Sequence, residues 1–368
     1  MSDSITLFLT GDVMTGRGID QILPHPSDPT LHEGYVKDAR VYVALAEEAS
    51  GPIPRPVSPR YIWGDILEVV QRMGPDLRVI NLETSITQSD DCWRGKEVHY
   101  RMHPENIGVL TTAKIDLCVL ANNHVLDWGY TGLKETLETL RKAGIKTAGA
   151  GMDLKEAQRP AIIEIEGRGK VIVFSFGSTT SGIPLEWAAS DKSPGVNLLP
   201  SYSEEILERI GEEVRWVKEK GDIVVASIHW GGNWGYSIPL REIDFAHRLI
   251  DEAAVDLIHG HSSHHVKGFE VYKGKLILYG CGDFLNDYEG IGGYASYRAD
   301  LGLIYLPRLD PSTGKLLRLE MVPTRIRSLR VNLTTQEERV WLTHLLNREG
   351  ERFGVRVMLT ERYVISLH

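Results

Sequence analysis

The sequence has few cysteines, and they are scattered. Cys92, Cys118 and Cys281 are the 3 cysteines among 368 residues, and none of them is spaced as Cys-x-x-Cys. This number and spacing exclude a disulfide framework and fit a reducing compartment. Cys118 and Cys281 stand within apolar runs, so we expect buried core thiols rather than metal ligands.

Long apolar runs and an excess of positive charge are also lacking. No stretch approaches the roughly 18 apolar residues that a membrane helix requires, and the short apolar run near the N-terminus follows no basic region. The sequence therefore predicts no membrane insertion, no secretion signal and a cytoplasmic location. A formal net charge of −9 argues against a nucleic-acid partner, so an anionic substrate would rely on metal ions and a few local cations.

The remaining composition, with 42% hydrophobic and 25% charged residues, is that of a globular protein. Apolar runs alternate with amphipathic segments up to about residue 266, and hairpins follow, which predicts an α/β fold with mixed sheets. We expect one domain over 1–330, with a proline-rich insertion near 23–62, and a helical extension over 331–368 packed on it. Expected strands include 5–9, 77–82, 115–120, 171–176 and 223–228, and expected helices include 36–49, 63–73, 132–143, 204–220, 241–254 and 336–348.

Five short polar clusters stand out because each follows an apolar run that reads as a buried strand. Strand ends of this kind emerge at one edge of a sheet, where ligands bind in open α/β folds. Carboxylate, amide and imidazole groups gathered there are what divalent cations need, and the mixture of oxygen and nitrogen ligands favours Mn, Zn or Fe over calcium. The clusters are Gly11-Asp12, Asn81-Leu82-Glu83, Asn122-Asn123-His124, His229-Trp230-Gly231 and the loop from His259 to His265.

The order of these clusters resembles the calcineurin-like metallophosphoesterase superfamily. It is most similar to the CapA branch, which is named for capsule and poly-γ-glutamate biosynthesis, and the resemblance covers about residues 5–290. It implies a sandwich of two mixed sheets flanked by helices. The motifs that carry it are Gly11-Asp12-Val13-Met14, Asn81-Leu82-Glu83-Thr84, Ala121-Asn122-Asn123-His124-Val125-Leu126-Asp127, Gly260-His261-Ser262-Ser263-His264-His265-Val266 and Gly280-Cys281-Gly282-Asp283-Phe284.

The resemblance also implies a site with one or two divalent transition-metal ions. By motif position, Asp12 would bind the first ion and Glu83 would stand where the superfamily has a bridging aspartate. The other implied ligands are Asn123, His229, His261 and His264. His124 would act as general acid or hold the phosphoryl group, and Asp127 would orient it.

Two departures from the superfamily pattern concern the first and last motifs. The first motif usually contains Asp-x-His, but Met14 occupies the histidine position, and a thioether is a poor ligand for such a site. The last motif has three histidines, so the ligand assignment among His261, His264 and His265 stays open. Glu83, which is longer than aspartate, would reach across the gap left by Met14.

Four residues are candidates for substrate contact. Arg101 is placed to clamp a phosphate or carboxylate, and a salt bridge at a strand edge is an equal alternative. Arg17 would line the cleft by position, and His265 would do so if it is not a ligand. Asn81 would either contact the site or hydrogen-bond the backbone at the strand end.

These observations predict a metal-dependent hydrolase acting on a phosphoester or related anionic substrate, either a small molecule or a polymer. Two alternatives stay open: a noncatalytic component that binds metal and polyanion, and a hydrolase of γ-glutamyl amide bonds. The CapA name suggests a link to capsule or polyglutamate metabolism. The sequence is compatible with an oligomer.

Overall fold

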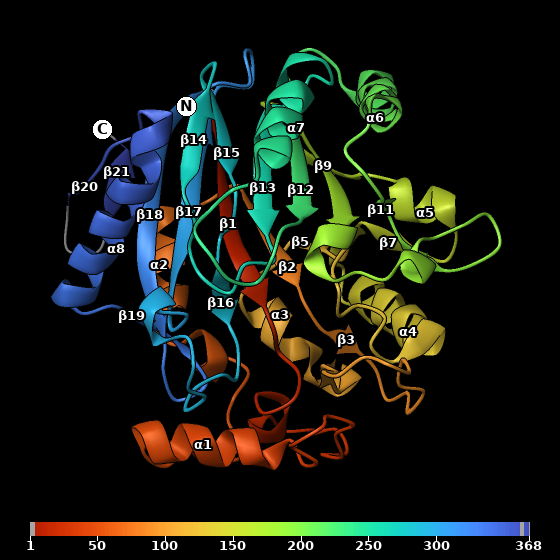
Figure 1. Ribbon diagram of the computed structural model, residues 1–368, viewed down its shortest axis with the longest axis vertical. Coiled ribbons are helices and arrows are strands. Elements are labelled where there is room, and N and C mark those ends of the chain that lie inside the picture. Colours follow the sequence, from red (N-terminus) through yellow and green to blue (C-terminus); the bar gives the residue numbers. More distant parts are fainter. Residues whose placement is uncertain (1–3, 361–363, 368) are drawn as a thin grey trace.

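A computed structural model describes residues 4–360 and 364–367, which form two mixed sheets packed face to face (Figure 1). The larger sheet has the strand order β20 (Val357–Leu359), β21 (Ile365–Leu367), β18 (Leu316–Ile326), β17 (Leu301–Leu309), β1 (Ile5–Val13), β2 (Leu77–Leu82), β5 (Leu117–Val119), β6 (Lys146–Ala148). In addition, β16 (Asp283–Leu285) pairs with β1, and β19 (Val331–Leu333) pairs with β18.

The smaller sheet contributes the second layer. Its order is β11 (Leu198–Leu199), β9 (Gly169–Ser178), β12 (Ile223–His229), β13 (Leu257–His261), β15 (Lys275–Leu278), β14 (Phe269–Tyr272), and β8 (Ala161–Ile165) pairs with β9. Two short pairs lie outside the sheets: β3 (Ser85–Ile86) with β4 (Arg101–Met102), and β7 (Ala150–Gly151) with β10 (Gly195–Val196).

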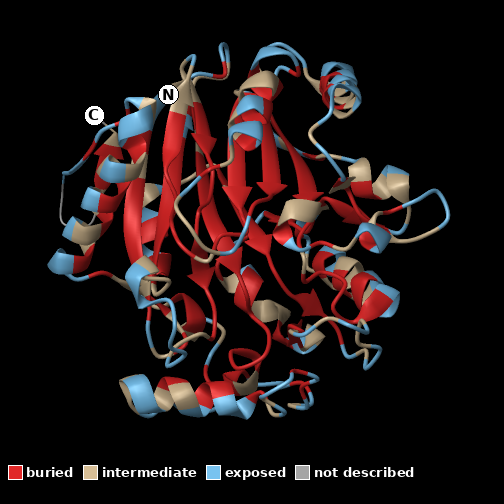
Figure 2. Ribbon diagram, viewed as in Figure 1, coloured by how far each residue is buried: buried red, intermediate tan, exposed pale blue. Residues whose placement is uncertain are grey.

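Alternation of side chains along the strands explains why both faces of each sheet are buried. In β1, Leu7 and Leu9 point into the core between the sheets, whereas Phe8 points to the opposite face. In β9, Val173 belongs to the core between the sheets and Phe174 to the outer one. Figure 2 shows the consequence, because the strands of both sheets are buried along most of their length.

Helices cover the two outer faces. On the larger sheet lie α2 (Ile66–Met73), α3 (Gly108–Thr112) and α4 (Gly129–Lys142); on the smaller sheet lie α6 (Glu204–Val217) and α7 (Leu240–Asp251). The short α5 (Leu154–Gln158) follows β7, and α1 (Arg40–Ser50) lies across one end of the molecule (Figure 1). Single-turn 3-10 helices occur at Asp20–Ile22, Tyr61–Trp63, Pro104–Ile107, Thr179–Ser181, Leu185–Trp187, Ala295–Tyr297 and Glu351–Phe353.

The predicted α/β sandwich flanked by helices is confirmed. The helix expected over 36–49 begins later, at Arg40, because residues 29–39 form a looped segment closed by an isolated bridge between Thr30 and Asp38. The C-terminal segment contains more than the expected helix: α8 (Gln336–Gly350) packs into the core between the sheets, and β20 and β21 extend the larger sheet. Within the described residues, no helix has the length and apolarity needed to cross a membrane.

The topology brings the polar clusters together. β1, β2 and β5 run parallel in the larger sheet, and β12 and β13 run parallel in the smaller one. The clusters follow the carboxyl ends of these five strands, so they converge where the two sheets meet.

Candidate metal centre

Asp12 is the penultimate residue of β1 and is fully buried. The strand passes close to the segment before β16 because residue 11 is glycine: a Cβ there would lie 1.6 Å from the carbonyl oxygen of Gly282. Asn81, on neighbouring β2, donates its side-chain amide to Asp12 Oδ1 at 2.7 Å and to Glu83 Oε2 at 3.0 Å. One amide therefore holds two carboxylates side by side.

The environment of these two carboxylates disfavours their charged forms. Burial raises the pKa of Asp12 to about 7, and the nearby Asp283 carboxylate adds to the shift. Burial also raises the pKa of Glu83 well above its ordinary value, with a further contribution from Asp12. Within the described residues, only histidines lie within ion-pair distance of these two groups. A bound cation would supply the compensating charge that the protein does not.

Two histidines face Asp12 from the smaller sheet. His229 ends β12 and His261 ends β13, and they are register partners in that parallel pair, with Nδ1 atoms 2.8 Å apart. Burial lowers the pKa of both well below the ordinary value, so both rings are neutral, the form that ligates metals. With Asp12 they form a buried group whose ligand atoms all lie within 4.8 Å of one another.

Glu83 and Asn123 adjoin this group at His229. The Nε2 atom of His229 lies 3.9 Å from Glu83 Oε1 and 3.2 Å from Asn123 Oδ1. Asn122, by contrast, donates its amide to Asn81 Oδ1 at 2.9 Å. It therefore helps to position the Asn81 amide that donates to both carboxylates. Of the two adjacent asparagines, the one expected as a ligand is therefore the one beside His229.

His264 is brought to the same region and is held by Asp283. Its Nδ1 lies 3.0 Å from Asp283 Oδ1, and Asn286 donates to the other carboxylate oxygen at 2.7 Å. Burial lowers the pKa of His264, but the Asp283 carboxylate outweighs it and keeps the pKa above its ordinary value. Asp283 is a register partner of Asp12 across the parallel strands β1 and β16, which explains why it reaches the site.

His261 is oriented by a chain of hydrogen bonds that begins at its Nε2 atom. Its Nε2 lies 2.9 Å from the Ser227 hydroxyl, which lies 3.0 Å from Nδ1 of His259. His259 Nε2 in turn lies 2.7 Å from the carbonyl oxygen of Thr10. All four residues are fully buried. Partners of this kind fix the orientation and tautomer of a ligating histidine.

His124 and Asp127 form the expected pair, with His124 Nδ1 2.7 Å from Asp127 Oδ2. The backbone N–H of Tyr100 donates to the same Asp127 oxygen at 2.6 Å, and the Tyr100 ring stands edge-on to His124. Burial lowers the pKa of His124 to about 4. Its Nε2 lies 3.9 Å from Glu83 Oε1, so the ring borders the carboxylate pair.

Lys96 is a site residue that sequence reasoning missed. Its Nζ lies 2.8 Å from His124 Nδ1, donates to the backbone carbonyl of Val98 at 3.2 Å and contacts the Asp127 carboxylate. In the sequence it stands in the charged stretch 94–97, which reads as a solvated loop, and no spacing relates it to the His124 cluster. Only the folded loop reveals its position.

The two candidate arginines are engaged with other groups. Arg17 donates to both Asp287 oxygens and to Glu33, and its guanidinium lies over the Tyr42 ring. Arg101 donates to the Ser89 carbonyl, the Asp90 carboxylate and the Asp28 carbonyl, and it stacks on Trp128. Arg17 lines a cleft beside His264. Arg101 connects the loops that contain Asp28, Ser89 and Asp90.

A cleft of about 500 Å³ opens beside His264. The proline-rich insertion contributes Tyr35 and Tyr42 to its lining, and the Tyr294 ring stacks on Trp234 at 3.9 Å on another wall. His265 is not among the residues that line it; the ring packs among Trp234, Tyr236 and Tyr297, and its Nδ1 faces the Val266 carbonyl at 3.1 Å.

Met14 is buried close to the same cleft. Its Sδ lies 3.7 Å from the Tyr288 hydroxyl, and the Tyr288 ring stands edge-on to His264. The thioether is therefore an acceptor for a tyrosine hydroxyl. The residues that fit a cation best are the carboxylates and neutral imidazoles of Asp12, Glu83, His229 and His261, since they are buried, close together and lack a counter-charge.

Comparison with known proteins identifies the family. A family model described as "Bacterial capsule synthesis protein PGA_cap" matches residues 6–288. The "Probable polyglutamine synthesis accessory protein" of Mycobacterium tuberculosis is 46% identical over 357 residues, which cover 97% of this chain and 94% of that protein. The "PGA biosynthesis protein CapA" of Bacillus subtilis is 32% identical over 209 residues, covering 56% of this chain and 52% of that protein.

The "Capsule biosynthesis protein CapA" of Bacillus anthracis is 23% identical over 286 residues, covering 78% of this chain and 61% of that protein. The family match includes every motif that the sequence analysis singled out. The chain therefore belongs to the CapA family of capsule and poly-γ-glutamate biosynthesis proteins, as the order of its motifs predicted.

Proposed function

We propose that this protein is a metal-dependent hydrolase of the metallophosphoesterase type that acts on a phosphoester or related anionic substrate in capsule or polyglutamate biosynthesis. The observation that carries the proposal is the buried group of Asp12, His229 and His261, whose ligand atoms lie within 4.8 Å of one another. One carboxylate and two neutral imidazoles suit Mn²⁺, Zn²⁺ or Fe²⁺. Glu83 and Asn123 adjoin His229 and would extend the site toward a second ion.

A divalent ion bound there would supply Lewis-acid polarisation of the scissile group and compensate the charge that develops on it. The remaining chemistry belongs to side chains of this protein. In its protonated form, His124 would donate a proton to the leaving oxygen from Nε2, which lies 3.9 Å from Glu83 Oε1. The Asp127 carboxylate accepts from the other nitrogen of that ring, and Lys96 contacts the same carboxylate. The cleft beside His264 would admit the substrate.

A noncatalytic role is the second candidate, in which the same group binds metal and anion while another protein performs the reaction. Met14 favours it, because the superfamily pattern has a histidine at this position and here the thioether contacts Tyr288 instead. Hydrolysis of a γ-glutamyl amide is the third candidate. The names of the relatives favour it, since PGA biosynthesis concerns a glutamate polymer, and the same cation would polarise a carbonyl.

The decisive experiment combines metal analysis with turnover of two substrates, bis-p-nitrophenyl phosphate and a γ-glutamyl oligomer. Wild type, His261→Ala and His247→Ala are compared after reconstitution with Mn²⁺, Zn²⁺ or Fe²⁺. His247 is the matched control, because it pairs with Glu270 away from the candidate ligands. The proposal expects metal uptake and diester hydrolysis in wild type and His247→Ala, and loss of both in His261→Ala.

The other outcomes separate the candidates. Cleavage of the oligomer without cleavage of the diester identifies an amide hydrolase. Metal uptake without turnover of either substrate identifies the noncatalytic role. Failure of every cation to bind, or equal behaviour of all three proteins, shows that the group is not a metal centre.

A further inference from the structure

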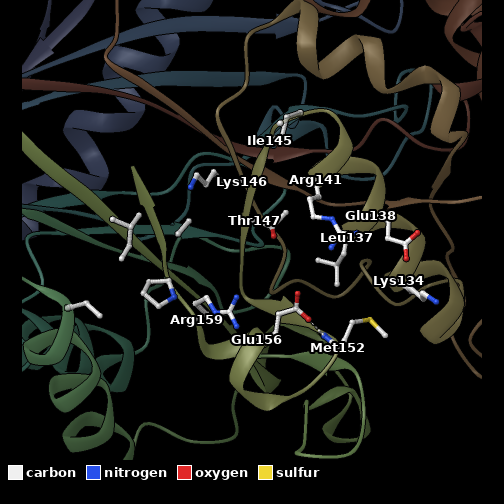
Figure 3. A pocket seen from close by; sticks show the side chains of 15 residues that line it. Lys134, Leu137, Glu138, Arg141, Ile145, Lys146, Thr147, Met152, Glu156 and Arg159 are labelled. Carbon is white, nitrogen blue, oxygen red and sulfur yellow. Dashed lines mark hydrogen bonds between the residues drawn. The ribbon is translucent and has the colours of Figure 1, made fainter. Parts of the chain in front are cut away.

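A second hollow, of about 650 Å³, opens at the edge of the sandwich, between α4, α5 and the edge strands β6 and β8 (Figure 3). It shares no lining residue with the cleft beside His264. Its charged side chains come from consecutive segments of the chain between residues 134 and 159. They are Lys134, Glu138 and Arg141 on α4, Lys146 on β6, Glu156 on α5, and Arg159 just after α5.

The four basic side chains in this hollow are exposed and have no acidic partner. Within the described residues, no ion pair is formed by Lys134, Arg141, Lys146 or Arg159. The Glu156 carboxylate accepts a hydrogen bond from the backbone N–H of Met152 at 2.7 Å. Four unpaired cations therefore face two carboxylates in a chain whose net charge is −9. The hollow is therefore a locally positive surface on a negatively charged protein.

The cleft beside His264 lacks such unpaired basic side chains among the described residues that line it. Each arginine that lines it is paired with a carboxylate: Arg17 with Glu33 and Asp287, Arg298 with Asp300, and Arg325 with Glu338. An anion with several charges would find the unpaired cations at the edge of the sandwich and not in that cleft.

The spacing of the cations favours a chain of charges over a single anion. Lys134 and Arg141 are seven residues apart on α4, which places them on one face and about 10 Å apart along the helix axis. One phosphate or carboxylate cannot bridge that distance. Lys146 and Arg159 extend the basic lining onto β6 and the segment leading into β8.

The other features of the hollow suit an extended polypeptide. In the described part of the chain, β6 pairs only with β5 and β8 only with β9, so each strand leaves one backbone edge open. Open edges accept extended peptides by adding a strand. Leu137, Met152 and Ile162 provide an apolar wall for the methylene groups of such a chain.

We propose that this hollow binds an acidic polypeptide in an extended conformation. Successive carboxylates pair with Lys134, Arg141, Lys146 and Arg159, and the chain lies along the open edges of β6 and β8. The site is separate from the metal centre and does not depend on the proposed hydrolase activity.

The test measures binding of a fluorescent hexaglutamate peptide to the full-length protein by anisotropy at low ionic strength. We expect saturable binding that weakens at higher salt, because screening reduces attraction between exposed charges. Arg141→Glu should weaken binding by about fivefold or more, since it replaces an attraction by a repulsion. Lys142→Glu, an equal charge change on the same helix outside the hollow, should change affinity by less than about twofold.

Asp12→Asn should bind the peptide as wild type does, which separates this site from the metal centre. Three results would overturn the proposal: no binding of hexaglutamate at low salt, equal weakening by Arg141→Glu and Lys142→Glu, or tighter binding of inorganic polyphosphate than of hexaglutamate. The last result would assign the hollow to phosphate polymers. Circular dichroism of both charge variants excludes loss of fold as the cause of weakened binding.

Discussion

His259 Nε2 lies 2.7 Å from the carbonyl oxygen of Thr10, and this contact determines which nitrogen of His261 is left unprotonated. Burial lowers the pKa of His259 to about 4, so the ring is neutral and its one proton is on Nε2, where the carbonyl accepts it. Nδ1 then accepts from the Ser227 hydroxyl. The Ser227 oxygen accepts from His261 Nε2. This leaves a lone pair on His261 Nδ1, which lies 3.9 Å from Asp12 Oδ1 and 2.8 Å from its hydrogen-bond partner, His229 Nδ1.

Replacing Ser227 by alanine should therefore lower metal affinity without removing a ligand. Loss of a hydrogen bond that orients a ligating histidine typically costs about 10- to 100-fold in affinity, and competition with a chromophoric chelator measures it. Ser175→Ala is the matched control, because Ser175 is the register partner of Ser227 on β9 and its buried hydroxyl has no hydrogen-bond partner among the described residues. Equal affinities for the two variants would contradict the orienting role.

Metal affinity should also fall as the pH drops below 7. The Asp12 carboxyl, with its pKa raised to about 7, holds a proton that must leave before the group can bind a cation. Above that pH Asp12 displaces no proton, whereas below it each pH unit lowers affinity by roughly tenfold. Titration calorimetry at about pH 6 and pH 8, in two buffers of different ionisation enthalpy, measures both the affinity and the protons released. Equal affinities without proton release would show that Asp12 is already ionised.

Much of the fold and of the candidate site could be predicted because it depends on local patterns. The apolar run at residues 77–82 coincides with strand β2, and the clusters at Asp12, Glu83, His229 and His261 converge as expected of parallel strand ends. Parallel strands of one sheet carry their ends to one edge whatever their order in that sheet. The convergence within each sheet therefore followed from strand assignment, whereas the meeting of the two sheets at these edges did not.

Other parts of the site depend on contacts that no local pattern encodes. The pairing of β16 with β1 brings Asp283 opposite Asp12, although the two are 271 residues apart. Lys96 reaches His124 from an irregular loop. Arg101, whose sequence position suggested a substrate clamp as readily as a salt bridge, has its donors occupied by Asp28, Ser89 and Asp90. Each of these facts required the tertiary structure.

Lys96→Met should lower turnover in the proposed reaction while leaving metal content unchanged. His124 is neutral at pH 7 because burial lowers its pKa, and its Nδ1 faces both Lys96 and Asp127. The Asp127 carboxylate accepts the ring proton from Nδ1, and Lys96 donates to the other carboxylate oxygen, so Lys96 helps to hold Asp127 and the ring in place. Without Lys96 the ring loses this support and Nε2 is displaced from the leaving oxygen, at a cost of about a hundredfold in kcat.

Lys220→Met is the control for Lys96→Met, since Lys220 is an exposed lysine outside the candidate site. Metal analysis of each preparation keeps the effect on kcat separate from an effect on occupancy. Unchanged kcat in Lys96→Met would mean that Lys96 only stabilises the loop.

Gly11→Ala should destabilise the protein and disturb Asp12. A Cβ at residue 11 would lie 1.6 Å from the Gly282 carbonyl oxygen, which accepts the backbone N–H of Asp12 at 3.0 Å. Overpacking against backbone costs about 1–3 kcal/mol, and the strained hydrogen bond adds about 1 kcal/mol. Urea unfolding should thus show a loss of about 3 kcal/mol. Gly34→Ala, where nothing lies within 4 Å of the added Cβ, should stay within about 1 kcal/mol of wild type. Equal unfolding midpoints for Gly11→Ala and wild type would mean that β1 and the segment before β16 can separate without cost.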